Sequence, residues 1–438
     1  MNKYVRKLFG IMFQSQPTRQ IVHIQPQHSP TSPEEWRQYW QAKGFPWRTE
    51  PEIDAKRQEE LSKRRAVAPD FEKGIYPFKG VKLSRSDVEW LLATHEDKLE
   101  PSDWEYDRYA GLDLRGANLS QVDLHGLPLA HLYGGLRREQ WDAATVEQRD
   151  MAGIHLEGAI LREAHLEGAY LKNAHLEKAD LTFAHLEYAH LANAHLEGAD
   201  LFRAHLEGAR LRGTNLAGAY LQLAYFDHAT VLDNAILGDE THGFVSVIDA
   251  RWGAVNLSVI DWKAVKMLGE ESRVRQSNTK IKQADWEYDE AARANRQLAV
   301  VLQNQGLNED AARFAYRAQI LQRKVLWKQH DFGKWLFSML LALLAGYGYR
   351  MGRILVAYLI IVLLCAGAYF VLGMYYQPHL SFLEAVLTSV TAFHGRVFSE
   401  PFLRPGEPQQ WVTAFEAIAG LVIEGVFIAM LTQKFFGK

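Results

Sequence analysis

The stretch that decides the fold is AHLEGAYLKNAHLEKADLTFAHLEYAHLANAHLEG, residues 164–198. It divides into five-residue units in which alanine comes first and a leucine or similar apolar residue stands two positions later, as at Ala164 and Leu166. A period of five fits neither the 3.6-residue period of a helix nor the two-residue alternation of a strand. A fixed period with one small and one large apolar residue indicates a repeat array whose units bury a shared core.

The same frame extends in both directions. Its central apolar residues continue to Leu221, Phe226, Val231 and Ile236, and earlier ones stand at Leu114, Leu119, Leu124 and Leu129. Two breaks, near residues 133–151 and 238–243, interrupt the frame. It then resumes at Val247, Trp252, Leu257, Trp262 and Met267. We therefore expect one continuous array over residues 111–270, with two inserted segments.

The units resemble the A(D/N)Lxx units of the pentapeptide-repeat family. This resemblance implies a right-handed quadrilateral β-helix with one unit per side, in which the central residue and the preceding alanine point inward. Residues 111–270 hold 22 acidic and 13 basic residues, a balance of −9. Some relatives mimic DNA, but this balance is mild and lacks a strongly charged face. We expect a cytoplasmic protein partner on the β-helix and no nucleic acid.

Histidine and glutamate recur within the array at ten-residue intervals. Six histidines, at positions 155, 165, 175, 185, 195 and 205, are each followed two positions later by glutamate. With about twenty residues per coil, His155, His175 and His195 stack on one face and the other three on the opposite face. Neighbours in each stack are about one strand spacing apart. Such ladders suit pH sensing or metal binding, or they are a solvated consensus of the repeat.

The segments beside the array have a helical pattern. Residues 1–110 are predicted to be a tail and capping region, with a helix starting at Ser32 and Pro33. Residues 271–332 contain two alanine-rich amphipathic stretches joined at Gly306. They resemble a tetratricopeptide-type helical hairpin, which would couple the array to the C-terminal part of the chain.

The last hundred residues are apolar, whereas the chain as a whole is 23% charged with a net charge of −3. Residues 354–376 and 411–432 are each long enough to span a bilayer. Lysine and arginine mark the cytoplasmic side of a membrane protein. Keeping the basic residues on one side makes residues 333–353 an interfacial helix and both termini cytoplasmic. The sequence thus predicts a multidomain, multi-pass protein of the cell (inner) membrane, in contact with the lipid bilayer.

Between the two spans, Ser381 and Glu384 form a capping box that starts a short helix. An extended stretch is expected after it, at Ala392–Arg396. This order resembles the two-transmembrane potassium-channel-like ion channels, so residues 354–438 are predicted to be a pore domain with a re-entrant pore helix and a pore loop at 381–398. The resemblance implies a homotetramer that conducts inorganic ions, with filter residues Thr391, Ala392, Phe393, His394, Gly395 and Arg396.

The filter departs from the family pattern TVGYG, because Phe393 replaces its first glycine. A phenylalanine adopts the positive φ of that glycine poorly. We therefore expect a weakly selective pore, or one not selective for K⁺. Glu384 and Glu416 are expected to support it, while the lining of the inner helix is predicted at Gly420, Glu424, Phe427 and Leu431.

The alternative is a non-conducting membrane-anchored scaffold in which TAFHG closes a helical hairpin. Nothing in the sequence forms a catalytic constellation, so we expect no enzyme activity, no catalytic residues and no cofactor. Cys365 is the single cysteine, which excludes an internal disulfide and a CxxC metal site. We expect no metal site.

Overall fold

The computed structural model describes residues 30–95, 111–276, 284–346, 351–375, 380–396 and 408–436. Parts of several predictions lie outside these residues. They are the tail at 1–29 and 96–110, residues 277–283 of the hairpin region, residues 347–350 of the interfacial helix, residue 376 of the first span, and residues 397–398 of the pore loop. The chain divides into two compact units, Met1–Glu52 and Ile53–Lys438.

The first unit holds helix α2, Pro33–Ala42, which begins as the sequence predicts. The Ser32 side chain accepts a hydrogen bond from the Glu35 N–H at 3.3 Å, and Pro33 opens the helix. Trp40 is 4% exposed, and the Arg48 guanidinium lies 3.5 Å from its ring centroid. An aromatic residue under a cation thus anchors this small unit.

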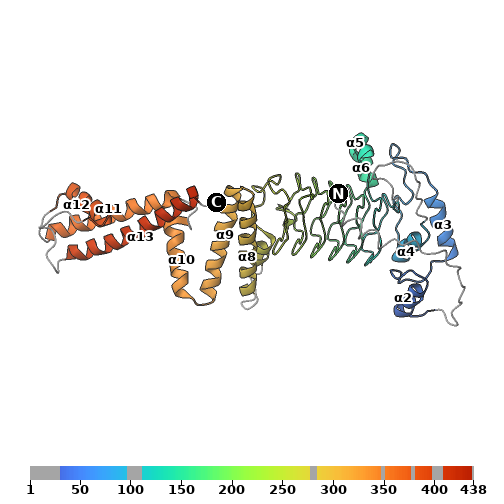
Figure 1. Ribbon diagram of the computed structural model, residues 1–438, viewed down its shortest axis with the longest axis horizontal. Helices are drawn as coiled ribbons and strands as arrows, with labels where there is room; N and C mark the ends of the chain where they lie inside the picture. The colour runs from blue at the N-terminus through green and yellow to red at the C-terminus, as the bar shows by residue number, and fades with distance from the viewer. Residues whose placement is uncertain are drawn as a thin grey trace, which may run out of the picture. The chain divides into compact units, whose positions relative to one another are not determined.

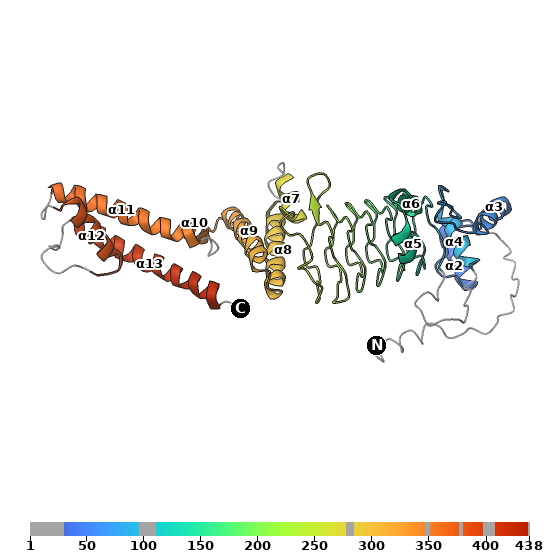
Figure 2. The same cartoon turned by 90° about the horizontal axis from the view of Figure 1, so that it is seen from above.

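The second unit begins with α3, Ala55–Arg65, and α4, Arg85–Ala93, and continues into the β-helix. Its coils follow one another as parallel bridges between residues twenty apart, such as His155 with His175 and Asp180 with Asp200 (Figure 2). Central leucines and the alanines before them are almost fully buried, Leu186 and Ala184 at 0% exposure. The predicted inward set is confirmed for this part of the array.

The two predicted interruptions are folded insertions. The first holds the short helices α5, Arg138–Ala143, and α6, Val146–Ala152, and the second holds the hairpin of β1, Gly238–Asp239, and β2, Gly243–Phe244. Coils on either side of each insertion still pair, as Asn118 does with His155 and Tyr220 with Ser246. The insertions therefore leave the stack of coils intact.

The predicted frame is wrong by one residue at Val231 and Ile236, and it is right again from Val247 to Trp262, where the predicted central residues are buried. Val231 pairs with Arg210, twenty-one residues earlier, so the turn at Asp227–Thr230 contains one additional residue. Leu232 and Leu237 are buried at 2% and 3% exposure, whereas Ile236 is 45% exposed. A one-residue shift exchanges inward and outward positions, so Val231 and Ile236 are not core residues.

Helix α7, Gly269–Gln276, and a helical hairpin follow the last coil. The hairpin consists of α8, Ala284–Asn304, and α9, Asn308–Lys328, packed side by side (Figure 1). Its turn contains Gly306 at φ +78°. The Gln305 side chain accepts a hydrogen bond from Leu257 N–H at 2.8 Å and donates one to the Val255 carbonyl at 2.7 Å. The turn that follows α8 thus satisfies backbone groups that no further coil pairs.

The apolar end contains four helices. These are α10, Phe332–Ala345; α11, Met351–Tyr375; α12, Phe382–Phe393; and α13, Pro408–Phe436 (Figure 1). Within the described residues, Gly352–Tyr375 and Pro408–Thr432 are long and apolar enough to cross a membrane. The helix predicted over residues 333–353 ends earlier, at Ala345, because Gly346 turns left-handed at φ +53°. Arg353 instead belongs to α11 and donates to the Ala342 carbonyl at 3.3 Å.

Candidate functional site

Helix α12 packs against both candidate spans, α11 and α13. Ser381 and Glu384 form the predicted capping box, with the Glu384 carboxylate accepting from Ser381 N–H at 2.8 Å. On the buried side of α12, the Ser389 hydroxyl contacts the Glu416 carboxylate of α13 and lies 2.9 Å from the Val362 carbonyl of α11. Glu416 is 0% exposed. Ser389 therefore joins all three helices.

The stretch predicted to be extended, Ala392–Arg396, is the end of a helix. Thr391, Ala392 and Phe393 belong to α12, and Gly395 has φ +68°. The Arg396 N–H donates to the Thr391 carbonyl at 2.9 Å, and the Gly395 N–H donates to the Ala392 carbonyl at 3.0 Å. This pair of bonds around a left-handed glycine is the Schellman motif that ends helices. The extended conformation predicted for these residues is wrong, because the glycine terminates the helix.

Phe393 and Gly420 meet inside the three-helix unit. Phe393 is 2% exposed and packs edge-on against Tyr358 of α11, with ring centroids 4.8 Å apart. A Cβ atom added to Gly420 would overlap the carbonyl oxygen of Phe393. Only glycine therefore permits α13 to approach the end of α12 this closely.

The remaining predicted residues lie nearer the surface. The imidazole of His394 is 47% exposed and the Glu424 carboxylate is 45% exposed, and their Nε2 and Oε1 atoms are 3.6 Å apart. Phe427 is partly buried against the core of the three helices, and Leu431 has intermediate exposure. The structure therefore divides the predicted site, with Ala392, Phe393 and Gly420 inside and His394, Gly395, Arg396 and Glu424 outside.

The two predicted histidine ladders are present on the β-helix. His155, His175 and His195 stack with ring centroids 4.7 and 5.0 Å apart, and the rings of His165, His185 and His205 stack at 4.9 and 5.0 Å. Each imidazole Nδ1 lies 2.9–3.4 Å from a carboxylate oxygen of the glutamate two positions later. The glutamates therefore orient the rings.

The electrostatics of a ladder are clearest at His165. Its hydrogen bond to Glu167 raises the pKa of His165, against the effect of burial. Burial alone would raise the pKa of Glu167, but the bond from His165 and a backbone hydrogen bond lower it overall. Among the described residues, the second carboxylate oxygen is buried without a hydrogen-bond partner in Glu167, Glu177, Glu187, Glu197 and Glu207.

Four sets of ladder residues bring possible metal-binding atoms within 4.8 Å of one another. They are His155, Glu157 and His175; His165, Glu167 and His185; Glu177, His195 and Glu197; and Glu187, His205 and Glu207. Imidazole and carboxylate are ligands that Zn²⁺ accepts, at about 2.0–2.2 Å from the ion. The candidate atoms would have to move closer together to bind an ion. The spacing of the ladders is the spacing of the repeat, so it is no sign of metal binding by itself.

Sequence reasoning missed a basic side of the β-helix. The units at 169–173, 189–193 and 209–213 contain Lys172, His190, Arg210 and Arg212 but no aspartate or glutamate. The signal was present, since every fourth unit belongs to the same side of a four-sided coil. A charge balance summed over the whole array conceals it.

Comparisons with known proteins concern the β-helix. The model of the family "Pentapeptide repeats" matches residues 150–186, 179–218 and 199–237. No curated protein matches the chain. A crystal structure of a pentapeptide repeat protein, Rfr23 from the cyanobacterium Cyanothece 51142, is similar at 25% identity. The match covers 32% of this chain and 90% of that one, with a TM-score of 0.21.

Two further solved structures are also pentapeptide repeat or resistance proteins that are similar to part of this chain. HetL, a pentapeptide repeat protein from a Nostoc strain involved in heterocyst differentiation regulation, is 19% identical, covering 41% of this chain and 95% of that chain, with a TM-score of 0.17. QnrB1, a plasmid-mediated fluoroquinolone resistance protein, is 17% identical, covering 34% and 79%, with a TM-score of 0.12. Together, the five-residue period, the stacked coils and the family match identify residues 150–237 as pentapeptide repeats within a β-helix.

Proposed function

We propose that this chain is a membrane-anchored scaffold, in which α11 and α13 hold the protein in a bilayer and the β-helix offers a docking surface to a protein partner. Helices α8 and α9 connect the two parts. In this proposal the β-helix is cytoplasmic, because Lys324, Lys328, Lys334, Arg353 and Lys434 then all face the cytoplasm. No catalytic step is assigned to any residue.

The observation that carries the proposal is the end of α12. A potassium filter needs successive backbone carbonyls that face the ion and replace its water. Here the carbonyls of Thr391 and Ala392 accept bonds from Arg396 and Gly395, and that of Phe393 packs against Gly420. Two of these three consecutive carbonyls therefore accept hydrogen bonds within the chain, and Gly420 packs against the third. This arrangement supports a closed helical hairpin rather than a filter.

Ion flux into liposomes tests the proposal. Purified full-length protein is reconstituted into liposomes loaded with a K⁺- or Na⁺-sensitive dye, and flux is started by an ion gradient. We expect the rate to equal that of protein-free liposomes, with gramicidin as the positive control. A reproducible, protein-dependent flux would overturn the non-conducting scaffold.

A second candidate is a weakly selective cation pore formed by an oligomer such as the predicted tetramer. It is favoured by the half-exposed pair of His394 and Glu424, which places a carboxylate on the outer face of the three-helix unit. Rings of acidic side chains favour cations in a pore. If flux is found, Glu424→Gln should lower the preference for cations over Cl⁻. An unchanged reversal potential would remove Glu424 from the path.

A further inference from the structure

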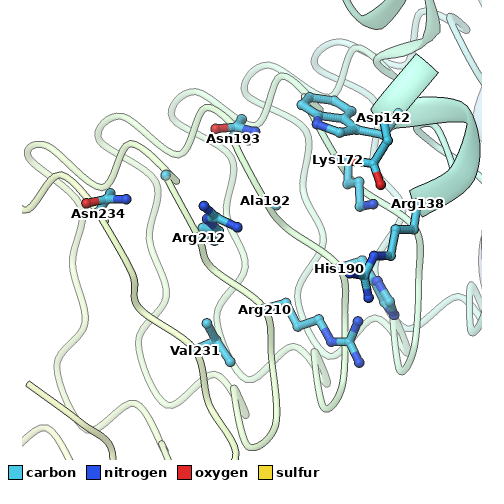
Figure 3. A pocket seen from close by; sticks show the side chains of 12 residues that line it. Arg138, Asp142, Lys172, His190, Ala192, Asn193, Arg210, Arg212, Val231 and Asn234 are labelled. Atoms are coloured by element: carbon cyan, nitrogen blue, oxygen red, sulfur yellow. The ribbon is translucent and has the colours of Figure 1, made fainter. Parts of the chain in front are cut away.

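A cavity of about 620 Å³ lies where α5 covers the basic side of the β-helix. Helix α5 contributes Arg138, Trp141 and Asp142, and successive coils contribute Lys172, His190, Arg210 and Arg212. Figure 3 shows Arg138 extending from α5 toward the coil face that carries His190 and Arg210. The insertion that interrupts the repeat thus builds one wall of this cavity.

The side chains around the cavity carry an excess of positive charge. Its lining contains four cations, Arg138, Lys172, Arg210 and Arg212, against the single carboxylate of Asp142. Another cation of the β-helix, Arg162, pairs directly with Asp180 at 2.6 Å. Within the described residues, none of the four cations of the cavity forms such an ion pair. The lining therefore keeps an excess of positive charge beyond the single carboxylate of Asp142.

Lys172 is the cation of this cavity whose burial costs free energy. It is 9% exposed, and its ammonium lies 5.8 Å from the centroid of the Trp141 ring. Burial lowers the pKa of Lys172; the charge of Asp142 opposes this shift, and that of Arg210 adds to it. Burial, with Arg210 and Lys172, also lowers the pKa of His190 to about 4. A buried cation with no direct ion pair is stabilised when an anion enters beside it.

The shape and donors of the cavity indicate which anion fits. Its volume falls in the usual range for small-molecule pockets. Arginine presents a planar fork of N–H donors that matches phosphate oxygens, and three arginines surround the space. Four cations against one carboxylate suit a ligand with more than one negative charge.

We propose that this cavity binds a small molecule bearing phosphate groups, held by Lys172, Arg210 and Arg212 under the wall formed by Arg138 and Trp141. This site does not depend on membrane anchoring or on ion conduction. Its position on the β-helix would make the ligand part of the docking surface.

Isothermal titration calorimetry on the full-length chain in detergent tests the site, with pyrophosphate as the probe at constant ionic strength. We expect one pyrophosphate per chain. Arg210→Gln should weaken binding about tenfold or more, because a charge-assisted hydrogen-bond donor is lost. Arg162→Gln removes the same charge outside the cavity and should change the affinity by no more than about twofold.

Thermal unfolding provides the second measurement. Lys172→Met should raise the unfolding temperature of the ligand-free protein, since it removes a buried cation that forms no direct ion pair, and should abolish most of the rise that pyrophosphate causes. Three results would overturn the proposal: no binding at millimolar pyrophosphate, equal weakening by Arg162→Gln and Arg210→Gln, or binding of a polyglutamate peptide through Arg210 without any binding of pyrophosphate.

Discussion

Gly395 has φ +68°, and the N–H groups of Gly395 and Arg396 close the last turn of α12. A left-handed backbone costs most residues about 1–2 kcal/mol, so glycine is suited to this position. The same glycine, in the sequence TAFHG, also agrees with the last glycine of a filter. From the sequence alone, Gly395 can therefore be either a helix-ending glycine or a filter glycine. The packing of Phe393 between α11 and α13 favours the helix end.

The contact between Gly420 and Phe393 gives the first prediction. Gly420→Ala should destabilise the three-helix unit by about 1–3 kcal/mol, because a Cβ atom has no room beside the Phe393 carbonyl. Gly425→Ala is the matched control, since nothing lies within 4 Å of its added Cβ. Thermal unfolding in detergent measures both. Equal unfolding temperatures for the two variants would show that α13 does not pack on the end of α12.

His190 predicts a pH dependence of stability. Its pKa is lowered to about 4 in the folded chain, so between pH 6.5 and pH 4 the unfolded chain binds a proton that the folded chain does not. Stability is therefore lost as pH falls through this window, by on the order of 2–3 kcal/mol. His190→Gln should reduce this loss, whereas substitution of His228, whose side chain is 82% exposed, should not. Unfolding temperatures measured from pH 7 to pH 4 test this role of His190. If the unfolding temperature of His190→Gln fell with pH in parallel with that of the wild type, the prediction would be contradicted.

At the scale of elements, the last coil of the β-helix ends in side-chain amides. Gln305 bonds to backbone groups of Leu257 and Val255, and Gln297 accepts from the Asp249 N–H at 3.0 Å. Glu270 of α7 accepts from Val247 N–H at 2.7 Å and from Ile248 N–H at 2.8 Å. These bonds prevent the last coil from presenting unpaired backbone groups, which would invite aggregation.

Gln305 gives the prediction that belongs to this scale. Gln305→Ala should lower the free energy of unfolding by about 1–3 kcal/mol, because it leaves a backbone donor and an acceptor unpaired beside buried apolar residues. Gln303→Ala, at an exposed position near the end of α8, should change it by less than about 0.5 kcal/mol. Urea unfolding followed by circular dichroism compares them. An equal effect of both variants would exclude the capping role.

The elements differ in how far the sequence predicts them. The period of five predicted the β-helix and the buried leucines, because one repeated pattern determines every coil. It failed at Val231 and Ile236, where a single additional residue at Asp227–Thr230 changes the register without altering composition. The contacts of α8 with the last coil were also beyond prediction, since they join residues about fifty positions apart.

On the scale of the whole molecule, composition predicts the division between a charged array and an apolar end. The two long apolar helices agree closely with the expected spans, differing by no more than three residues at their ends. The charges of the basic cavity and the helix end at Gly395 depend on which residues meet in space. The pattern of residues along the chain does not predict them, because the residues involved are distant in sequence.

Alkaline extraction of cell membranes tests most directly whether α11 and α13 anchor the chain. After a carbonate wash at high pH, which strips peripheral proteins, we expect the full-length chain in the membrane pellet. Replacing two exposed residues at the middle of α11, Ile360→Arg with Leu364→Arg, should move much of the protein into the supernatant or prevent its accumulation, because charged side chains at the bilayer centre are costly. Recovery of the unaltered chain in the supernatant would contradict the membrane-anchored scaffold.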